Sequence, residues 1–290
     1  MAAPTIERID DRRRAASGRT AAENTAVRTV EIIRVGQESA ASVSDVTAAE
    51  EPLEIRLDGQ RFVVTMRTPG ADADLATGFL LSEGIVGAAS DVAAIRHCAL
   101  NDNILYVSLA GDAVGRAETA MKGRRHVTAS SACGVCGRRS IDDLMANARQ
   151  VESTVSVSRT VIGGLPDALR AAQRGFDQTG GLHAAGLFDR TGGLLRVAED
   201  VGRHNAVDKV FGAELSSGRL PLSDRILFVS GRTSFEIVQK AVMAGVPVVS
   251  AVSAPSSLAI ELAAQAGITL LGFVRGAAFN IYTHAARIAV

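Results

Sequence analysis

Two cysteines in C-x-x-C spacing are the clearest candidates for chemistry in this chain. Cys133 and Cys136 lie in the stretch SSACGVCGRRS, and the 290 residues contain one other cysteine, Cys98. Two thiols at this spacing are typical of half a structural zinc site, of a redox dithiol, or of a nucleophile that carries a group. A fortuitous pair in an exposed loop is the remaining interpretation. The residues around the pair, and the ligands available elsewhere, distinguish among these possibilities.

A zinc site needs partners that the sequence hardly provides. Structural zinc is usually held by four Cys or His ligands, and only Cys98 and the 5 histidines remain to complete a set. Zinc deaminases use H-x-E together with P-C-x-x-C, but no histidine here has Glu two residues later, and Ala132 stands in the place of the proline. We therefore expect no zinc. A structural site built from Cys98, Cys133, Cys136 and one histidine stays open as an alternative.

The charges around the pair favour a group carrier. Residues 124–126 (Arg-Arg-His) precede it, and Arg138 and Arg139 follow it. Cationic neighbours stabilise the thiolate, which is the nucleophilic form of cysteine. Gly134 and Gly137 give the segment backbone freedom, which suits a carrier that visits two sites. A carried sulfane sulfur, as Cys–S–SH, has these requirements.

Composition restricts the class of protein. Lys plus Arg equals Asp plus Glu, at 31 each, so no global field would attract nucleic acid or an anionic membrane. Three cysteines do not make a disulfide framework, which favours a cytoplasmic setting. The most apolar stretch, 241–274, is interrupted by Pro247, Pro255 and Glu261, whereas a bilayer span takes about 20 nearly unbroken apolar residues. We expect a soluble protein that binds neither nucleic acid nor membrane.

The first half of the chain divides into three parts. Residues 1–28 show no apolar period and are predicted to be a disordered tail. Residues 29–120 are predicted to form a small α+β domain, in which apolar and polar residues alternate on both sides of a hairpin turn at Asp58-Gly59. Residues 121–140 hold the cysteine pair and are predicted to be a mobile loop.

The second half, residues 141–290, alternates strands and helices. A helix is expected to begin at Pro166, and a strand hairpin follows it. Continuously apolar strands then alternate with helices of about 12 residues, which is typical of parallel βαβ units. The predicted fold class is therefore α/β: a small N-terminal α+β unit plus a three-layer α/β/α domain with a mixed sheet.

The predicted parallel strands each lead into a loop of small polar residues. These loops are SGRTS at 230–234, SAPSS at 253–257 and RGAA at 275–278. Ligands of open α/β sheets bind beyond the carboxyl ends of the strands, where helix N-termini present free N–H groups. Small residues such as Ser230 admit a ligand to the backbone, while Arg232 and Arg275 supply charge suited to phosphates. The pattern predicts an anionic, nucleotide-like ligand.

The segment EDVGRHNAVDK adds further polar groups to this edge. Arg203 and His204 begin a predicted helix, and Asp208 lies one turn beyond His204. Residues four apart share a helix face, so His204 and Asp208 are predicted to form an acid/base or ligand-binding pair. The alternative is a capped helix whose charged face is solvated.

With these residues considered, the chain resembles the formate dehydrogenase accessory sulfurtransferases, the FdhD-type family. The resemblance spans most of the chain from about residue 30 and is carried by SACGVCGRRS, TGGLHAAGLF, EDVGRHNAVDKVFG, VSGRTSFEIVQKA, SAPSSLAIELA and GFVRGAAFNIYTH. It implies a cytidine-deaminase-like C-terminal domain without the zinc chemistry, and a homodimer. It also implies that sulfur passes from a cysteine desulfurase to the molybdenum cofactor, bis-molybdopterin guanine dinucleotide, before the cofactor enters formate dehydrogenase.

The resemblance assigns roles by position. Cys133 is similar to the persulfide-bearing cysteine of the family, and Cys136 to its helper. The family's cofactor-binding stretch matches Phe273, Val274, Arg275, Gly276, Ala277 and Ala278. The predicted anion site agrees with this guanine nucleotide-like ligand, because a dinucleotide presents pyrophosphates to helix N-termini and arginines. A chaperone that only binds the cofactor, with incidental thiols, is the alternative function.

Overall fold

The structure is a computed structural model that describes residues 7–8, 26–37, 39–124 and 150–289. Cys133 and Cys136 lie outside the described residues, as does most of the predicted mobile loop at 121–140. The expectations for that loop therefore stay predictions.

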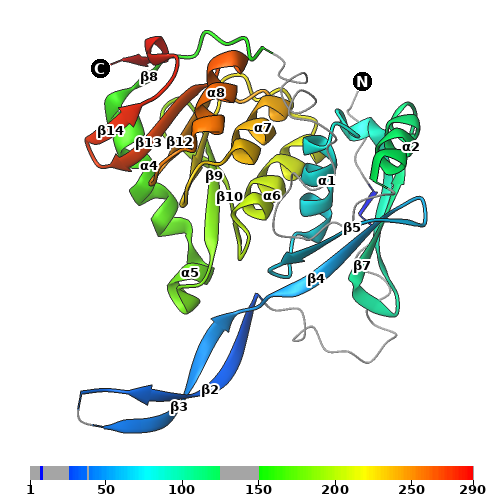
Figure 1. Cartoon of the computed structure of the whole chain (residues 1–290), viewed down its shortest axis with the longest axis vertical. Coiled ribbons are helices and arrows are strands. Elements are labelled where there is room, and N and C mark those ends of the chain that lie inside the picture. The colour runs from blue at the N-terminus through cyan, green and yellow to red at the C-terminus, as the bar shows by residue number, and fades with distance from the viewer. Residues whose placement is uncertain (1–6, 9–25, 38, 125–149, 290) are drawn as a thin grey trace.

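The C-terminal half forms the predicted α/β/α sandwich (Figure 1). Its six-stranded sheet has the order β10-β9-β11-β12-β13-β14, with β11, β12 and β13 parallel and the outer strands antiparallel. The strands are β9 His183–Phe188, β10 Leu194–Asp200, β11 Ile226–Val229, β12 Val248–Ala251, β13 Thr269–Arg275 and β14 Ala278–Ile281. This mixed sheet confirms the predicted fold class.

Helices cover both faces of this sheet, because successive side chains of the strand β11 pack against helices on opposite faces. The helices are α4 Arg159–Ala172, α5 Arg174–Thr179, α6 Arg203–Ser216, α7 Phe235–Ala244 and α8 Ser257–Ala266. Phe228 of β11 packs with Leu165 of α4 on one face, whereas the next residue back, Leu227, joins the cluster of α6, α7 and α8 on the other. A short strand β8, Val157–Ser158, pairs with β15, Ile288–Ala289, and the turn Ala285–Arg287 precedes β15.

Helix α4 begins earlier than the sequence suggests. It starts at Arg159, where the side-chain oxygen of Ser158 accepts a hydrogen bond from the Val161 N–H at 3.3 Å. Pro166, predicted at the first turn, lies inside the helix. The prediction was wrong because Gly163 and Gly164 read as a loop. Gly163 in fact lies against the turn after β13: a Cβ there would be 2.6 Å from the carbonyl oxygen of Gly276.

The N-terminal unit is a second sheet with two helices. Its order is β1-β6-β7-β4-β5, formed by β1 Glu7–Arg8, β4 Glu51–Leu57, β5 Gln60–Arg67, β6 Val92–Cys98 and β7 Asn101–Leu109. The helices are α1 Asp72–Ser82 and α2 Ala113–Arg124, and a single 3₁₀ turn spans Ala89–Asp91. Positive φ angles of 45° at Asp58 and 87° at Gly59 close the β4–β5 hairpin at the predicted turn.

Two segments within or beside the predicted disordered tail are ordered. Glu7–Arg8 form β1, which pairs with β6 in parallel. Strands β2 Val27–Val35 and β3 Ala40–Ala48 form a separate two-stranded ribbon that projects from the rest of the chain (Figure 1). The prediction of disorder for 1–28 is therefore wrong at residues 7–8 and 27–28. For β1 the reason is that its partner strand β6 is distant in sequence, so local composition does not reveal the pairing.

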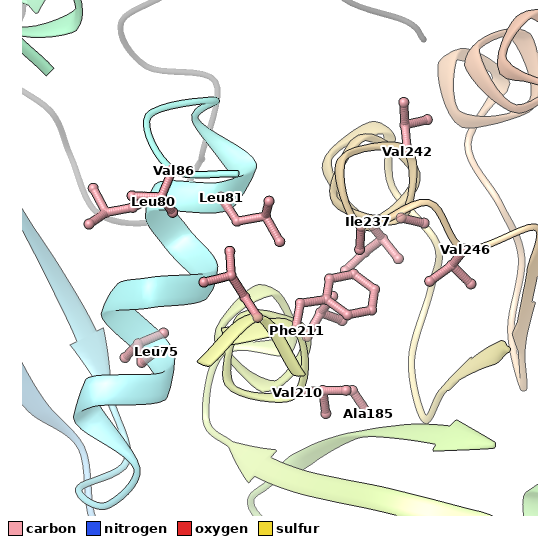
Figure 2. Packing of buried hydrophobic residues seen from close by; sticks show 14 of the residues in the cluster. Leu75, Leu80, Leu81, Val86, Ala185, Val210, Phe211, Ile237, Val242 and Val246 are labelled. Carbon is pink, nitrogen blue, oxygen red and sulfur yellow. The ribbon is translucent and has the colours of Figure 1, made fainter. Parts of the chain in front are cut away.

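Helices α1 and α6 join the two units, and their backbones are in direct contact at two glycines. A Cβ added to Gly78 of α1 would be 1.9 Å from the carbonyl oxygen of Asp208, and one added to Gly212 of α6 would be 1.9 Å from that of Asp74. Phe211 of α6 belongs to the same hydrophobic cluster, and its ring extends toward Ile237 of α7 (Figure 2). One continuous core therefore runs through both units and holds the edge of the larger sheet in place.

Candidate functional site

A cavity of about 600 Å³ opens at the carboxyl edge of the six-stranded sheet, on the α4 face. The end of α4, helix α5 and the following loop make its wall, and the ends of β9, β11 and β12 make its floor. This is the sheet edge at which the sequence predicts a ligand.

The wall of the cavity combines charge, an amide and an aromatic ring. The Arg170 guanidinium lies over the Phe176 ring, 4.8 Å from its centroid, and pairs with Asp177 at 2.6 Å. Gln173, between the two helices, is only 4% exposed and lines the cavity. The loop after α5 begins at Gly180, whose φ of 66° favours glycine and ends that helix.

The floor places a serine and a histidine beside apolar side chains. Val252 supplies apolar surface, and the fully buried Phe228 lies behind it. Ser230, a predicted site residue, lines the cavity; its hydroxyl oxygen accepts a hydrogen bond from the Ala184 N–H at 2.8 Å. His183 lines it too, and burial, followed by the charge of Arg203, lowers the pKa of its imidazole. The neutral ring can therefore donate or accept a hydrogen bond at neutral pH.

His183 connects the cavity to the start of α6. A Cβ added to Gly231 would be 3.4 Å from the imidazole Nδ1 of His183 and 3.9 Å from Cδ of Arg203, so these three residues adjoin. The buried Nε of Arg203 has no hydrogen-bond partner among the described residues. A buried donor without a partner is costly, and an anion at this edge would supply the acceptor.

His204 lies beside the start of α7. Its Nε2 is 3.0 Å from the hydroxyl oxygen of Ser234 and 3.8 Å from a carboxylate oxygen of Glu236. Burial, and then the positive charge of Lys240, lower the pKa of His204 to about 4. The imidazole is therefore neutral at pH 7 and is a polar contact, not a fixed cation.

Two of the three small-residue loops, 230–234 and 253–257, adjoin at this edge as predicted, and the strand that leads to the third loop contacts the loop at 253–257. The Thr233 N–H donates to the carbonyl of Ala254 at 3.2 Å, and the Ser256 N–H donates to the carbonyl of Thr233 at 3.0 Å. The Phe273 N–H donates to the carbonyl of Ser253 at 3.2 Å. These bonds align the N-termini of α7 and α8 with the end of β13. Arg232 and Arg275 are exposed on two of these loops.

The stretch Phe273 to Ala278 forms the end of β13, a turn and the start of β14. Phe273 is 40% exposed and adopts a positive φ of 54°, which is unusual for a residue with a side chain. Arg275, Gly276, Ala277 and Ala278 are exposed. Val274 is buried in the core under α4, so it can offer a ligand only its backbone.

Asp208 does not join this edge. Both of its carboxylate oxygens accept hydrogen bonds from Lys240 at 2.8 Å, and one also accepts from the Ser82 hydroxyl at 2.9 Å. It is 1% exposed. The predicted pair of His204 with Asp208 is therefore wrong. The alternative of a solvated face is also wrong, because α1 covers α6 and residues 205–215 are all buried.

Asp200 holds the start of α6 instead. Its carboxylate accepts hydrogen bonds from the N–H groups of Thr68 at 3.1 Å and Gly202 at 2.8 Å, and it pairs with Lys209 at 2.7 Å. The Asn205 side chain donates to it at 3.0 Å. The N-terminal unit thus fixes the backbone that carries Arg203.

Sequence reasoning missed the cavity wall and His183. His183 lies within the motif TGGLHAAGLF, and its place at the beginning of a strand antiparallel to β11 is the signal that could have identified it. The wall residues carry no such signal, because only tertiary packing brings α4 and α5 over this edge.

Among the described residues, no group of three or more His, Cys, Asp or Glu side chains could hold a metal ion. The thiol of Cys98 is free and its residue is half-buried. No helix in this part of the chain is long and apolar enough to cross a membrane.

Comparison with known proteins identifies the family. The family model described as FdhD/NarQ family matches residues 48–289. The chain belongs to the FdhD/NarQ family. The resemblance inferred from the motifs is thereby confirmed.

Proteins named as sulfur carriers are similar over nearly the whole chain. The protein from Streptomyces avermitilis named Sulfur carrier protein FdhD is 50% identical and covers 89% of this chain and 94% of its own length. A protein of the same name from Anaeromyxobacter sp. strain K is 47% identical over 96% of each chain. In fold, the chain is similar to the crystal structure of a putative formate dehydrogenase accessory protein from Desulfotalea psychrophila, with a TM-score of 0.72, 22% identity and coverage of 91% and 100% of the two chains.

Proposed function

We propose that this protein carries persulfide sulfur from a cysteine desulfurase to the molybdenum cofactor, bis-molybdopterin guanine dinucleotide, for use by formate dehydrogenase. The name sulfur carrier, which the relatives share, does not specify the cargo, and one structural observation supports a nucleotide cargo. A cavity of about 600 Å³ adjoins a cationic sheet edge, which suits a large anionic nucleotide as cargo.

The carrier step uses Cys133. Its thiolate attacks the terminal sulfur of the desulfurase persulfide, so that a new S–S bond forms, the old one breaks, and the desulfurase cysteine leaves as thiolate. Delivery as hydrosulfide then needs two electrons. Attack of the Cys136 thiolate on the inner sulfur of Cys133 supplies them, leaving a Cys133–Cys136 disulfide and releasing HS⁻ to the molybdenum. Both cysteines lie outside the described residues.

The described residues bind the cargo. The cavity takes a guanosine portion against Phe176. Arg203, whose Nε has no partner in the described part of the chain, and the exposed Arg232 and Arg275 contact phosphate oxygens. The exposed residues of the stretch from Phe273 to Ala278 continue this contact along the edge, while neutral His204 hydrogen-bonds without adding charge.

A persulfide assay tests the carrier step. The protein is incubated with a cysteine desulfurase and cysteine, and its mass is measured without reductant. We expect a gain of one sulfur atom on Cys133, no gain in Cys133→Ala, and a gain without subsequent sulfide release in Cys136→Ala. Formate dehydrogenase activity should be lost in Cys133→Ala while nucleotide binding persists. Normal activity in that variant would refute the mechanism and favour the binding chaperone.

The family resemblance also favours a homodimer in the cytoplasm. Light scattering on the purified chain, with its formula mass of 30.1 kDa, measures the oligomeric state directly. A mass of one chain at micromolar concentration contradicts this part of the proposal and leaves the carrier step untouched.

A further inference from the structure

The cavity contains one acidic side chain that the proposed function leaves unused. Of the described residues that line the cavity, Asp167 is the single carboxylate. It projects from α4 one turn before Arg170, but Arg170 pairs with Asp177 on α5 instead. Asp167 has no ion pair and no side-chain hydrogen bond within the part of the chain that the structure describes, so both of its oxygens are available to a ligand.

A second polar group of the same wall also lacks a partner. The Gln173 amide belongs to a residue that is only 4% exposed, and no described residue hydrogen-bonds to its side chain. The amide atoms of Gln173 are not among the fully buried polar atoms that lack a partner, so the amide reaches the cavity that the residue lines. Its donor and its acceptor are therefore available to a ligand.

The remaining lining defines the shape of that ligand. Phe176 contributes an aromatic ring and Val252 contributes aliphatic surface, whereas Phe228 and Leu169 are fully buried behind them. Apolar and aromatic walls with a few polar groups suit a planar heterocycle, which stacks on its faces and hydrogen-bonds at its edge.

A carboxylate at the edge of such a ring discriminates between the purines. Guanine presents two adjacent donors, N1–H and the 2-amino group, which match the two oxygens of one carboxylate. Adenine presents an acceptor at N1, which a carboxylate repels. A site built to accept those donors rejects the analogue that lacks them.

We propose that Asp167 is the specificity-determining residue of the cavity and selects guanine by accepting hydrogen bonds from N1–H and the 2-amino group, with Gln173 bonding the same ring. This inference rests on the proposed function, because it assigns the guanine of the cargo to this cavity.

Exchange of the carboxylate for an amide tests the assignment. Calorimetric titrations with GDP, ADP and xanthosine diphosphate are compared for the wild type, Asp167→Asn and Asp112→Asn. Asp112 is an exposed carboxylate of the N-terminal unit, so its variant has the same change of charge away from the cavity. Because Asp167 is exposed to solvent, its variant should fold, which circular dichroism verifies.

The wild type and Asp112→Asn should bind GDP about 10- to 100-fold more tightly than ADP, which corresponds to the loss of a hydrogen-bond pair to a charged group. Asp167→Asn should lose about that factor for GDP and gain affinity for xanthosine diphosphate, whose 2-carbonyl accepts from the new amide. Unchanged GDP affinity in Asp167→Asn overturns the inference, and so does a loss for GDP without any gain for xanthosine diphosphate.

The persulfide assay separates the two proposals. If Cys133 acquires sulfur while Asp167→Asn binds GDP normally, the carrier function stands and the guanine assignment fails. If the wild type binds no guanine nucleotide, both the assignment and the cargo-binding role of the cavity fail.

Discussion

Lys240 of α7 donates hydrogen bonds to both carboxylate oxygens of Asp208 in α6, at 2.8 Å each. Ser82 of α1 donates to the same carboxylate, so one buried charge joins helices from both units. Asp208 lies one helical turn after His204, yet it serves the packing of the domain and not the ligand edge.

Removing the lysine should destabilise the fold strongly. In Lys240→Met, the Asp208 carboxylate loses its counter-charge while it stays buried, and breaking such pairs costs about 3–5 kcal/mol. Urea denaturation measures the free energy of unfolding. The double variant Lys240→Met with Asp208→Asn should recover part of the loss, because no unpaired charge remains. A loss below about 1 kcal/mol in the single variant contradicts this role.

Two glycine-to-alanine changes should have opposite effects on stability, because one glycine lies at the α1–α6 backbone contact and the other lies in α2, away from any contact. In Gly212→Ala, the new Cβ would be 1.9 Å from the Asp74 carbonyl oxygen, so the helices must separate, at a cost of about 1–3 kcal/mol or more. Gly115, within α2, has no atom within 4 Å of its Cβ position. Gly115→Ala should stabilise the protein by about 0.5–1 kcal/mol. Thermal melting compares the two, and equal midpoints would show that the helices can part freely.

The buried His204 predicts a dependence of stability on pH. Its pKa is about 4 in the folded protein and about 6.5 in the unfolded chain, so the unfolded state binds more protons between these values. Stability should therefore fall as pH decreases from 7.5, by about 3 kcal/mol in total as pH approaches 4. His204→Gln should flatten the decline between pH 7.5 and 5.5 in urea titrations. An identical decline in wild type and variant excludes His204 as its source.

Much of the larger sheet could be predicted because its signals are local. Segments that are wholly or largely apolar, such as 226–229 and 248–251, are typical of buried parallel strands. The left-handed turn at Asp58-Gly59 needs residues that tolerate positive φ. The adjacency of the loops at 230–234 and 253–257 then follows from geometry, because parallel strands all end at one edge of a sheet.

The parts that could not be predicted depend on distant contacts. Helix periodicity places Asp208 on a face of α6 but does not show that α1 covers that face, or that Lys240 lies opposite. Gly163 reads as a helix breaker, although the helix needs it because Gly276 approaches closely. Asp167 and Gln173 are ordinary polar residues in sequence, and only the position of α4 over the sheet edge makes them lining residues.

Asp200 accepts a hydrogen bond from the Thr68 N–H, so the N-terminal unit helps to position the start of α6, where Arg203 lies. We therefore predict that Asp200 influences anion binding without contacting the anion. Asp200 is fully buried, pairs with Lys209 and accepts a hydrogen bond from the Gly202 N–H. The variant Asp200→Asn therefore leaves Lys209 without its counter-charge. It also weakens the hydrogen bonds that hold the backbone before Arg203. We expect a stability loss of about 3 kcal/mol and weaker binding of pyrophosphate, measured calorimetrically well below the melting temperature. Asp112→Asn, with the same change of charge at the surface, should alter neither quantity. Full pyrophosphate affinity in a destabilised Asp200→Asn would show that Asp200 supports the fold without positioning the site.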